Sequence, residues 1–180
     1  KDVSFTYQGS NIPALSHVSF QVESGQTIAL VGPSGGGKTT AASLIPRFWD
    51  VDEGIVEVGH VNVKNIDQHV LMNQVAFVFQ NTQLFKTSIL NNVKIANPQA
   101  SDEDVIKALQ AARCQDIIEK LPDGVHTQIG KEGTYLSGGE QQRIALARAI
   151  LKNAPIVVLD EATAFADPEN EVLIQKALSV

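Results

Sequence analysis

The chain has 180 residues, of which 43% are hydrophobic and 19% charged, and its formal net charge is −6 at pH 7. This length fits one globular domain and is too short for two typical ones, while the composition excludes a disordered chain. The acidic balance disfavours a general nucleic-acid binder, whose phosphate contacts need a surplus of lysine and arginine, so no nucleic-acid partner is expected.

The start of the chain and its apolar runs predict a piece of a longer polypeptide, with any membrane part lying elsewhere. The chain opens on Lys1 and Asp2, without an initiator methionine or a secretory signal. Apolar runs such as 28–31 and 156–159 are far shorter than the roughly 18 residues that span a bilayer. The single cysteine, Cys114, cannot form an internal disulfide, so we expect it to be a packing residue in a reducing compartment.

The first predicted elements are two strands of an antiparallel entry. Residues 3–7 and 18–22 are rich in β-formers, with Gly9 and Pro13 marking the turn region between them. Residues 27–31 are a short apolar run that ends at a glycine-rich loop, and residues 38–48 are compatible with a helix. A strand, a loop and a helix in this order are half of a βα unit.

The glycine-rich loop is the first candidate site, because it matches G-x-x-x-x-G-K-[ST] between a strand and a helix. Its glycines let backbone N–H groups converge on a phosphate, and the helix N-terminus adds positive charge there. Lys38 is suited to reach terminal phosphates, and Thr39 to place its hydroxyl on Mg²⁺. The alternative is a glycine-rich turn that merely caps a helix. The loop consists of Gly32, Pro33, Ser34, Gly35, Gly36, Gly37, Lys38 and Thr39.

Two further strands and a helical insertion follow the first βα half-unit. Residues 75–79 and 156–159 predict buried strands of a parallel sheet whose two faces are covered. Between them, residues 102–121 carry apolar side chains at helical spacing, and Pro122 and Gly124 end that pattern. The sequence therefore predicts an α/β fold in which a helical insertion separates two sheet-forming halves.

The second candidate site is a pair of carboxylates at the carboxyl end of the last strand, where open α/β sheets bind ligands. Asp160 is suited to hold Mg²⁺ or its water, and Glu161 to accept a proton from the water that attacks a γ-phosphate. The alternative is that the two carboxylates simply cap the next loop.

The third candidate site is the start of the helix that follows Leu136. Ser137 and Glu140 have the spacing of a capping box, which explains those two residues. It does not explain Gly138 and Gly139, because each glycine in a first turn costs helix stability relative to alanine. Bare backbone at a helix N-terminus is a second anion site, so the chain has two phosphate-binding devices and one expected nucleotide.

Together these segments resemble the ATP-binding cassette ATPases, and the resemblance covers essentially the whole chain. LSGGEQQR, which begins at Leu136, looks like the family signature, which binds the nucleotide held by a second, head-to-tail subunit. The resemblance implies a P-loop NTPase core with a mostly parallel sheet, an antiparallel β entry and an inserted α-helical subdomain. It implies one cassette over residues 1–180, with 1–80 and 144–180 as the catalytic core and 81–143 as the helical and signature subdomain.

The resemblance also implies roles for single residues, with ATP and Mg²⁺ as cofactors. Tyr7 corresponds to the aromatic residue that stacks on adenine, although without the resemblance such a tyrosine is more often a strand residue that packs on its neighbour. Gln80 looks like the glutamine that senses Mg²⁺, its alternative being a polar residue at a strand end. The implied set is Lys38 and Glu161 for catalysis; Tyr7, Gly32 to Thr39, Thr40, Gln80 and Asp160 for the nucleotide; Thr39, Gln80 and Asp160 for the metal; Leu136, Ser137, Gly138, Gly139 and Glu140 for the nucleotide in trans; and Ala164 and Asp167 for the dimer loop.

Several segments and departures refine the resemblance. Residues 127–133 and 81–93 look like exporter segments, but Lys131 stands where exporters usually have glutamate, and Ala164 replaces the usual serine. Phe85 and Ile89 suit either a grip on a membrane-domain helix or the core. The family's switch histidine is expected beyond Val180. The four histidines of this chain do not correspond to it: His17, His60, His69 and His126. Weak ATP hydrolysis is therefore expected of this chain.

The function implied is an ATP-hydrolysing motor that dimerises on ATP and drives attached transmembrane domains. The second cassette and those domains are its expected partners, and its expected location is the cytoplasmic side of a membrane. The alternatives are a soluble ATPase of the superfamily, of translation or DNA-repair type, and a non-hydrolysing half of a heterodimer. Repair-type members carry a long coiled coil between the two motifs, and no heptad stretch separates Lys38 from Ser137.

Overall fold

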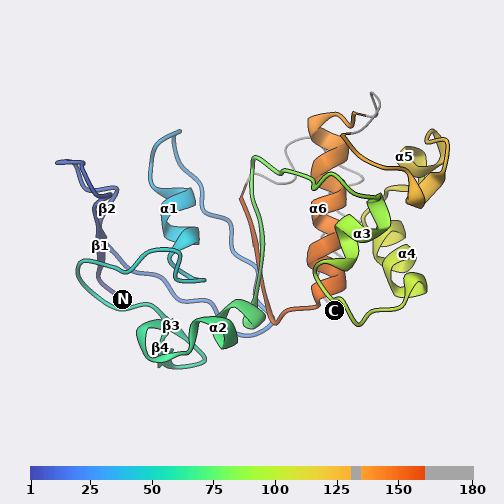
Figure 1. Cartoon of the computed structure of the whole chain (residues 1–180). Coiled ribbons are helices and arrows are strands. Elements are labelled where there is room, and N and C mark those ends of the chain that lie inside the picture. Colours follow the sequence, from blue (N-terminus) through green and yellow to red (C-terminus); the bar gives the residue numbers. More distant parts are fainter. Residues whose placement is uncertain (131–134, 161–180) are drawn as a thin grey trace. The chain divides into compact units, whose positions relative to one another are not determined.

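The computed structural model describes residues 1–130 and 135–160 of the chain. The chain divides into two compact units, residues 1–75 and residues 76–180. Figure 1 labels the helices of both units and the strands of the first. No helix in the described part of the chain has the length and apolar character needed to cross a membrane.

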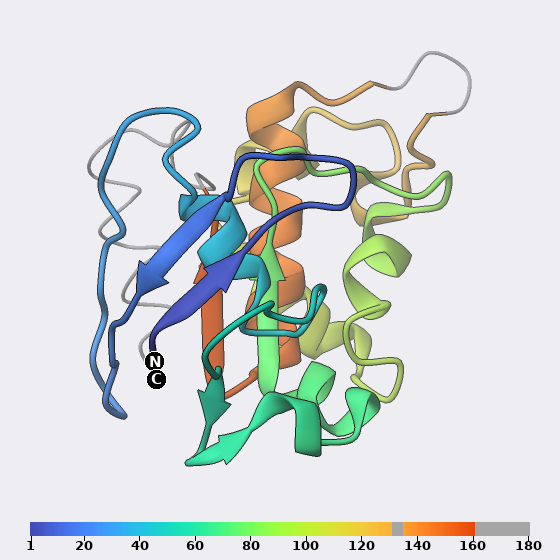
Figure 2. The same ribbon diagram turned by 90° about the vertical axis from the view of Figure 1, so that its left-hand side faces the viewer.

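The first unit begins with the predicted antiparallel pair, in which β1 (Val3–Phe5) lies beside β2 (Leu15–Val18). Figure 2 shows their two arrows side by side and pointing in opposite directions. The antiparallel entry is thus confirmed, but the second strand ends at Val18, where the prediction begins it. Beyond Val18 the side chains of Phe20 and Val22 are 44% and 42% exposed, so no buried face holds residues 18–22 as a strand.

The predicted strand over residues 27–31 is not formed. This stretch has no ladder hydrogen bonds within residues 1–130 and 135–160, and Val31 is 92% exposed. An apolar run becomes a strand only when a neighbour pairs with its backbone groups. The described sheets are accordingly three two-stranded pairs, of which β5 with β6 is the candidate for the predicted parallel sheet.

Helix α1 (Lys38–Ser43) starts where the sequence predicts, but ends well before Phe48. Pro46 has no backbone N–H to donate to the preceding turn, and Arg47 adopts a left-handed backbone with φ 57°. Leu44, which follows the helix, is 2% exposed and packs with Val3 and Phe5 of β1 in the core of this unit. The helix is therefore anchored to the antiparallel pair at its C-terminal end.

The first unit closes with small elements built on local signals. Strands β3 (Glu57–Val58) and β4 (Val61–Asn62) form a hairpin whose two turn residues, Gly59 and His60, have φ of 57° and 64°. Positive φ at both positions is what a two-residue turn of the hairpin type requires. A short 3₁₀ turn, η1 (Val63–Asn65), leads to α2 (Gln68–Gln74), whose first turn is capped by the Asp67 carboxylate.

The second unit contains the two predicted strands, which pair with each other. They are β5 (Val75–Val78), which begins at the unit boundary, and β6 (Ile156–Leu159). Figure 2 shows both arrows pointing the same way, and the backbone N–H of Asp160 donates to the carbonyl of Val78 at 2.9 Å. The carboxyl ends of the two strands therefore lie at the same edge.

The helices of the second unit surround α6 (Gly138–Lys152). The predicted helical stretch over residues 102–121 is divided into α4 (Asp102–Ala111) and α5 (Gln115–Glu119), because Arg113 adopts φ 58° and breaks the ladder. Cys114 beside it is fully buried, as the packing role predicts. The remaining elements are α3 (Ile89–Lys94) and η2 (Gly124–His126).

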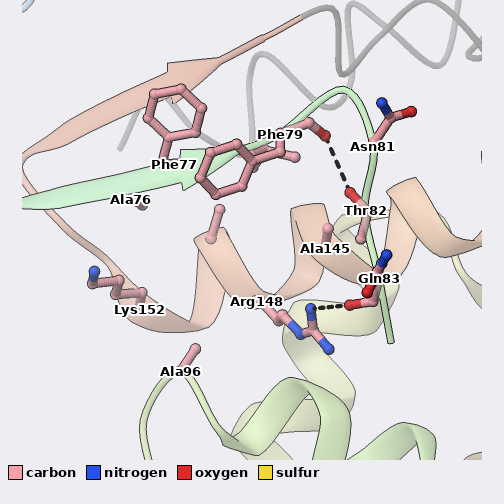
Figure 3. Close-up of a pocket in the computed structure, with 12 residues that line it drawn as sticks. Ala76, Phe77, Phe79, Asn81, Thr82, Gln83, Ala96, Ala145, Arg148 and Lys152 are labelled. Carbon is pink, nitrogen blue, oxygen red and sulfur yellow. Dashed lines mark hydrogen bonds between the residues drawn. The ribbon is translucent and has the colours of Figure 1, made fainter. Parts of the chain in front are cut away.

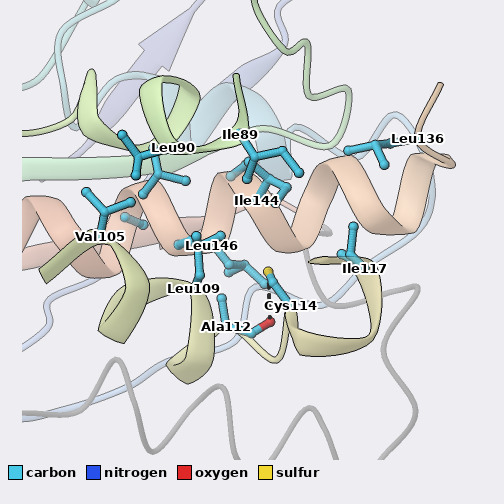
Figure 4. Packing of buried hydrophobic residues seen from close by; sticks show 14 of the residues in the cluster. Ile89, Leu90, Val105, Leu109, Ala112, Cys114, Ile117, Leu136, Ile144 and Leu146 are labelled. Atoms are coloured by element: carbon cyan, nitrogen blue, oxygen red, sulfur yellow. Dashed lines mark hydrogen bonds between the residues drawn. The ribbon is translucent and has the colours of Figure 1, made fainter. Parts of the chain in front are cut away.

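The core of the second unit forms on two sides of α6. Figure 4 shows Ile89 and Leu90 of α3 on one side of this helix and Leu109 of α4 on the other, with Ile144 and Leu146 of α6 between them. Burial of each such side chain contributes about 1.5–3 kcal/mol to folding. The helix that begins at the signature is thus the central helix of its unit.

Candidate nucleotide site

The phosphate loop keeps the conformation that its glycines permit. Gly35 and Gly37 have φ of 77° and 81°, and the N–H of Gly36 closes a turn on the carbonyl of Pro33 at 3.1 Å. A Cβ on Gly37 would lie 2.6 Å from the carbonyl oxygen of Ala14, in the chain just before β2. Gly37 therefore needs to be glycine for two reasons: its positive φ, and the carbonyl oxygen of Ala14 close to where a Cβ would lie.

The Lys38 side chain lies across this loop. Its ammonium donates to the carbonyl oxygens of Gly32 at 3.0 Å and Pro33 at 2.8 Å. The ammonium is therefore held over the loop backbone by neutral acceptors, which a phosphate oxygen can replace with a stronger, charge-assisted bond. Thr39, the next residue, is exposed at the start of α1, as a metal-binding hydroxyl must be.

Tyr7 lies beside the helix that follows the loop. Its hydroxyl is 3.0 Å from Oγ1 of Thr40, which is 6% exposed. Its ring packs edge-on against Phe5, with centroids 4.9 Å apart, and against Trp49, with centroids 5.6 Å apart. The packing role is thus observed, and the half-exposed ring leaves stacking on adenine as a prediction.

Gln80 and Asp160 follow the adjacent strands β5 and β6, so the second unit brings these two predicted metal ligands to one sheet edge. Both offer side-chain oxygens. Oxygen donors of this kind are the ligands that Mg²⁺ prefers, so the donor set fits that ion. The catalytic carboxylate Glu161 and the dimer-loop residues Ala164 and Asp167 lie outside the described residues, as does Lys131.

The predicted capping box opens α6. Ser137 Oγ accepts from the N–H of Glu140 at 3.3 Å, and the Glu140 carboxylate accepts from the N–H of Ser137 at 2.8 Å. Leu136, just before it, is buried and joins the core. These bonds satisfy two groups at the helix start, and the other N–H groups of the first turn have no intrahelical partner.

Gly138 has no structural need to be glycine. A Cβ built there meets no atom within 4 Å, and its φ is not in the left-handed region. The residue is also exposed. Because alanine would make a more stable helix at this position, the open backbone favours a role in contacting something outside the chain.

The two exporter-like segments pair with each other in the second unit. The N–H of Ile129 donates to the carbonyl of Thr87 at 3.0 Å, and the N–H of Ile89 to that of Thr127 at 3.3 Å. Ile89 is fully buried and therefore a core residue. Phe85 is 58% exposed, so only this second side chain is accessible to an external partner.

Two arginines of α6 hold other segments and were not among the predicted residues. Arg143 makes a two-pronged ion pair with Asp116 of α5, at 2.6 and 3.0 Å. Arg148 bonds to Asn92, which is fully buried in α3. No sequence motif marks Arg148 as such a residue, because its partner Asn92 lies 56 residues away along the chain.

The sequence profile of the ABC transporter family matches residues 15–164, and the chain belongs to this family. The ATP-dependent lipid A-core flippase of Vibrio vulnificus (strain CMCP6) is 47% identical over 179 residues. The flippase of the same name from Coxiella burnetii (strain RSA 493 / Nine Mile phase I) is 46% identical over 177 residues. These segments are 99% and 98% of this chain and only 31% and 30% of the flippases, so the chain spans about a third of their length.

A solved structure, that of a bacterial Atm1-family ABC exporter with ATP bound, has the same fold. Its TM-score is 0.91 at 37% identity, over 98% of this chain and 31% of the exporter chain. The chain therefore has the mixed α/β fold of the ATP-binding domain of this family. The recognition of an exporter-type ATP-binding domain from the sequence is confirmed.

Proposed function

We propose that this chain is the ATP-binding and ATP-hydrolysing motor domain of an ABC exporter, and that two such domains close head to tail on ATP. The observation that carries the proposal is the presence of two candidate anion-binding sites on one chain. One is the loop around Lys38, and the other is the open backbone at Gly138. A chain with one nucleotide needs the second device only if it serves a partner's nucleotide.

The first device holds the phosphates of ATP in this proposal. The ammonium of Lys38 leaves the carbonyls of Gly32 and Pro33 for the terminal phosphates, and the loop N–H groups and the N-terminus of α1 face the remaining phosphate oxygens. Tyr7 contributes its ring to the adenine. The remaining loop residues act through their backbone groups, with Thr40 supporting Tyr7: Ser34, Gly35, Gly36 and Gly37.

Thr39, Gln80 and Asp160 are the proposed oxygen ligands of Mg²⁺, which, when bound, neutralises charge on the transferred phosphoryl group. Glu161 is the proposed general base. It follows Asp160 directly in the sequence, and its proposed role is to take a proton from the attacking water.

The second device serves the nucleotide of the partner domain. Ser137 offers its hydroxyl, and Gly138 and Gly139 offer bare N–H groups at the helix start. Leu136 and Glu140 support this turn, the first through the core and the second through the capping box. Ala164 and Asp167 are proposed to line the dimer interface.

We infer that the finer architecture follows the family. Residues 1–80 and 144–180 form a catalytic core with a mostly parallel sheet, and residues 81–143 form the helical and signature subdomain of one cassette. In the intact transporter the chain lies on the cytoplasmic side of a membrane, joined to transmembrane domains. ATP-driven closure and hydrolysis-driven opening then move those domains, since the two states differ in their affinity for ATP.

Nucleotide binding and turnover of two variants test the proposal. Lys38→Ala is expected to lose ATP binding, while Glu161→Gln keeps the affinity and loses turnover by at least about a hundredfold. Lys120→Ala, which removes an exposed lysine far along the chain, is the matched control and leaves both unchanged. A Glu161→Gln protein with undiminished hydrolysis contradicts the general-base assignment.

A further inference from the structure

Arg148, midway along the second half of α6, is held by two segments that are distant in sequence. Its Nε donates to the carbonyl oxygen of Asn92 at 2.6 Å and its Nη2 to Oδ1 of Asn92 at 2.7 Å. Its Nη1 donates to the carbonyl oxygen of Gln83 at 3.3 Å, and its guanidinium carbon lies 5.6 Å from the centroid of the Phe85 ring. Figure 3 shows the guanidinium reaching Gln83 at the rim of the hollow beside β5.

No carboxylate lies within ion-pair distance of Arg148 among residues 1–130 and 135–160. Its surroundings are instead neutral acceptors and an aromatic ring, and burial lowers the pKa of its guanidinium. A charge removed from water without a counter-charge costs folding energy that an apolar side chain would not. The arginine is therefore better explained by its directional bonds than by packing.

Asn92, the partner of Arg148, makes further hydrogen bonds to the segment that follows Gln80. Its side chain accepts from the N–H of Phe85 at 2.8 Å and donates to the carbonyl of Phe85 at 3.0 Å. Closer to Gln80, the Thr82 hydroxyl donates to the carbonyl of Phe79 at 3.1 Å. The stretch from residue 79 to residue 85 is thus fixed at several points, and two of them converge on Arg148.

We propose that Arg148 is a positioning residue that joins the segment after Gln80 to the signature helix, so that a displacement of either is passed to the other. Resting on the proposed function, this gives the chain a direct connection between its own Mg²⁺-binding glutamine and the helix that serves the partner's nucleotide. The connection runs through one rigid helix, because Arg148 and the signature residue Gly138 both belong to α6. In this proposal Arg148 affects the nucleotide sites indirectly, by positioning Gln80 and the signature, and it does not contact a nucleotide itself.

Hydrogen exchange of the full chain, measured by mass spectrometry without nucleotide, tests whether Arg148 holds the segment after Gln80 in place. Arg148→Met is expected to speed exchange in residues 81–88 about tenfold or more, the effect of losing bonds from a charged donor. Arg148→Lys keeps a cation but not the planar fork, so its exchange lies between those of wild type and Arg148→Met. Arg143→Met is the matched control on the same helix, and it speeds exchange only around its partner Asp116.

A double-mutant comparison of turnover tests the coupling. If Arg148 acts through Gln80, the losses from Arg148→Lys and Gln80→Ala do not multiply, and the double variant is about as slow as the slower single one. Multiplying losses, or unchanged exchange in residues 81–88, overturn the proposal. If wild type hydrolyses no ATP, the proposed function fails, but the hydrogen exchange result still decides the role of Arg148. If Arg148→Met does not fold, Arg148→Lys is used for both the exchange and the turnover measurements.

Discussion

The hydroxyl of Tyr7 lies 3.0 Å from Oγ1 of Thr40, so the segment just after β1 is hydrogen-bonded directly to the helix that follows the phosphate loop. Thr40 is buried, and the Tyr7 ring is fixed edge-on between Phe5 and Trp49. One hydrogen bond therefore joins the candidate adenine-binding residue to the helix of the candidate phosphate site, and both lie beside the same small core.

Removing that hydrogen bond is expected to separate stability from nucleotide stacking. Tyr7→Phe keeps the ring and loses about 1 kcal/mol of unfolding free energy, whereas Tyr7→Ala also loses ATP affinity. Urea unfolding and ATP titration followed by Trp49 fluorescence measure both effects. Tyr135→Phe, at a tyrosine that is 80% exposed, is the control with no effect, and a Tyr7→Phe protein as stable as wild type contradicts the structural role.

Gly37→Ala is expected to damage the first unit more than alanine at any other loop glycine. The new Cβ would lie 2.6 Å from the Ala14 carbonyl oxygen and 2.7 Å from Leu15 Cδ2, at φ 81°. Strain and overpacking together cost about 2–4 kcal/mol, and ATP binding is lost with the loop geometry. In Gly35→Ala the backbone angle is strained but space is open, so about 1 kcal/mol is expected.

Thermal unfolding of both variants decides this prediction, with Gly32→Ala as the control that has open space and no positive φ. The predicted order of Tm is Gly32→Ala, then Gly35→Ala, then Gly37→Ala as the lowest. An equal Tm for Gly35→Ala and Gly37→Ala would show that the approach to Ala14 is unimportant.

The ion pair between Arg143 and Asp116 is expected to make stability depend on pH. The hydrogen bonds from Arg143 hold the pKa of Asp116 below its usual value. Because the folded pKa is below the unfolded one, the pair stabilises the fold at neutral pH, and this contribution is lost as the pH falls through the folded pKa. Asp116 is half exposed, so the gain is about 1 kcal/mol at most.

Urea unfolding of wild type and Asp116→Asn between pH 7 and pH 3 measures this contribution. The difference in unfolding free energy is expected to be largest at pH 7 and to shrink on acidification. Glu103→Gln removes an exposed ion pair with Lys107 and serves as the control with little effect at any pH. A difference for Asp116→Asn that grows toward low pH contradicts the assignment.

The Cys114 thiol is expected to be unreactive in the folded chain. It is fully buried, and burial raises its pKa to about 12. At pH 8 the thiol is therefore almost entirely protonated, and reagents have no access to it. Labelling with a thiol reagent should be slow in buffer and fast in urea, and rapid labelling of the native chain would show that this core opens.

The elements that the sequence predicts well are those with local causes. The strands at 75–78 and 156–159 are continuous apolar runs, and the capping box at Ser137 and Glu140 is a spacing of three residues. The predicted strand at 27–31 fails because a strand depends on a partner that its own residues do not specify. The break in the helix at Arg113 is missed for a similar reason, since the left-handed backbone of an arginine depends on its surroundings.

The candidate site divides in the same way. The phosphate loop, the carboxylates and the signature are contiguous motifs, so residues such as Lys38 and Gly138 are predictable from spacing alone. Arg148 and Asn92 are not, because 56 residues separate the two partners and neither belongs to a motif. Tyr7 lies between these cases, since its position suggests a nucleotide and its bond to Thr40 appears only in three dimensions.

The proposed head-to-tail closure depends on Gly138, which presents open backbone to the nucleotide of a second copy. Sedimentation of the Glu161→Gln chain with and without ATP tests it most directly, alone and with Gly138→Ala or Gly138→Asp added. We expect an ATP-dependent dimer that Gly138→Asp abolishes, because the new carboxylate would lie against a phosphate. We also expect that Gly138→Ala weakens this dimer although it raises helix stability by roughly 0.5–1 kcal/mol. A chain that stays monomeric at saturating ATP, or that dimerises equally well with Gly138→Asp, would rule out this role of Gly138.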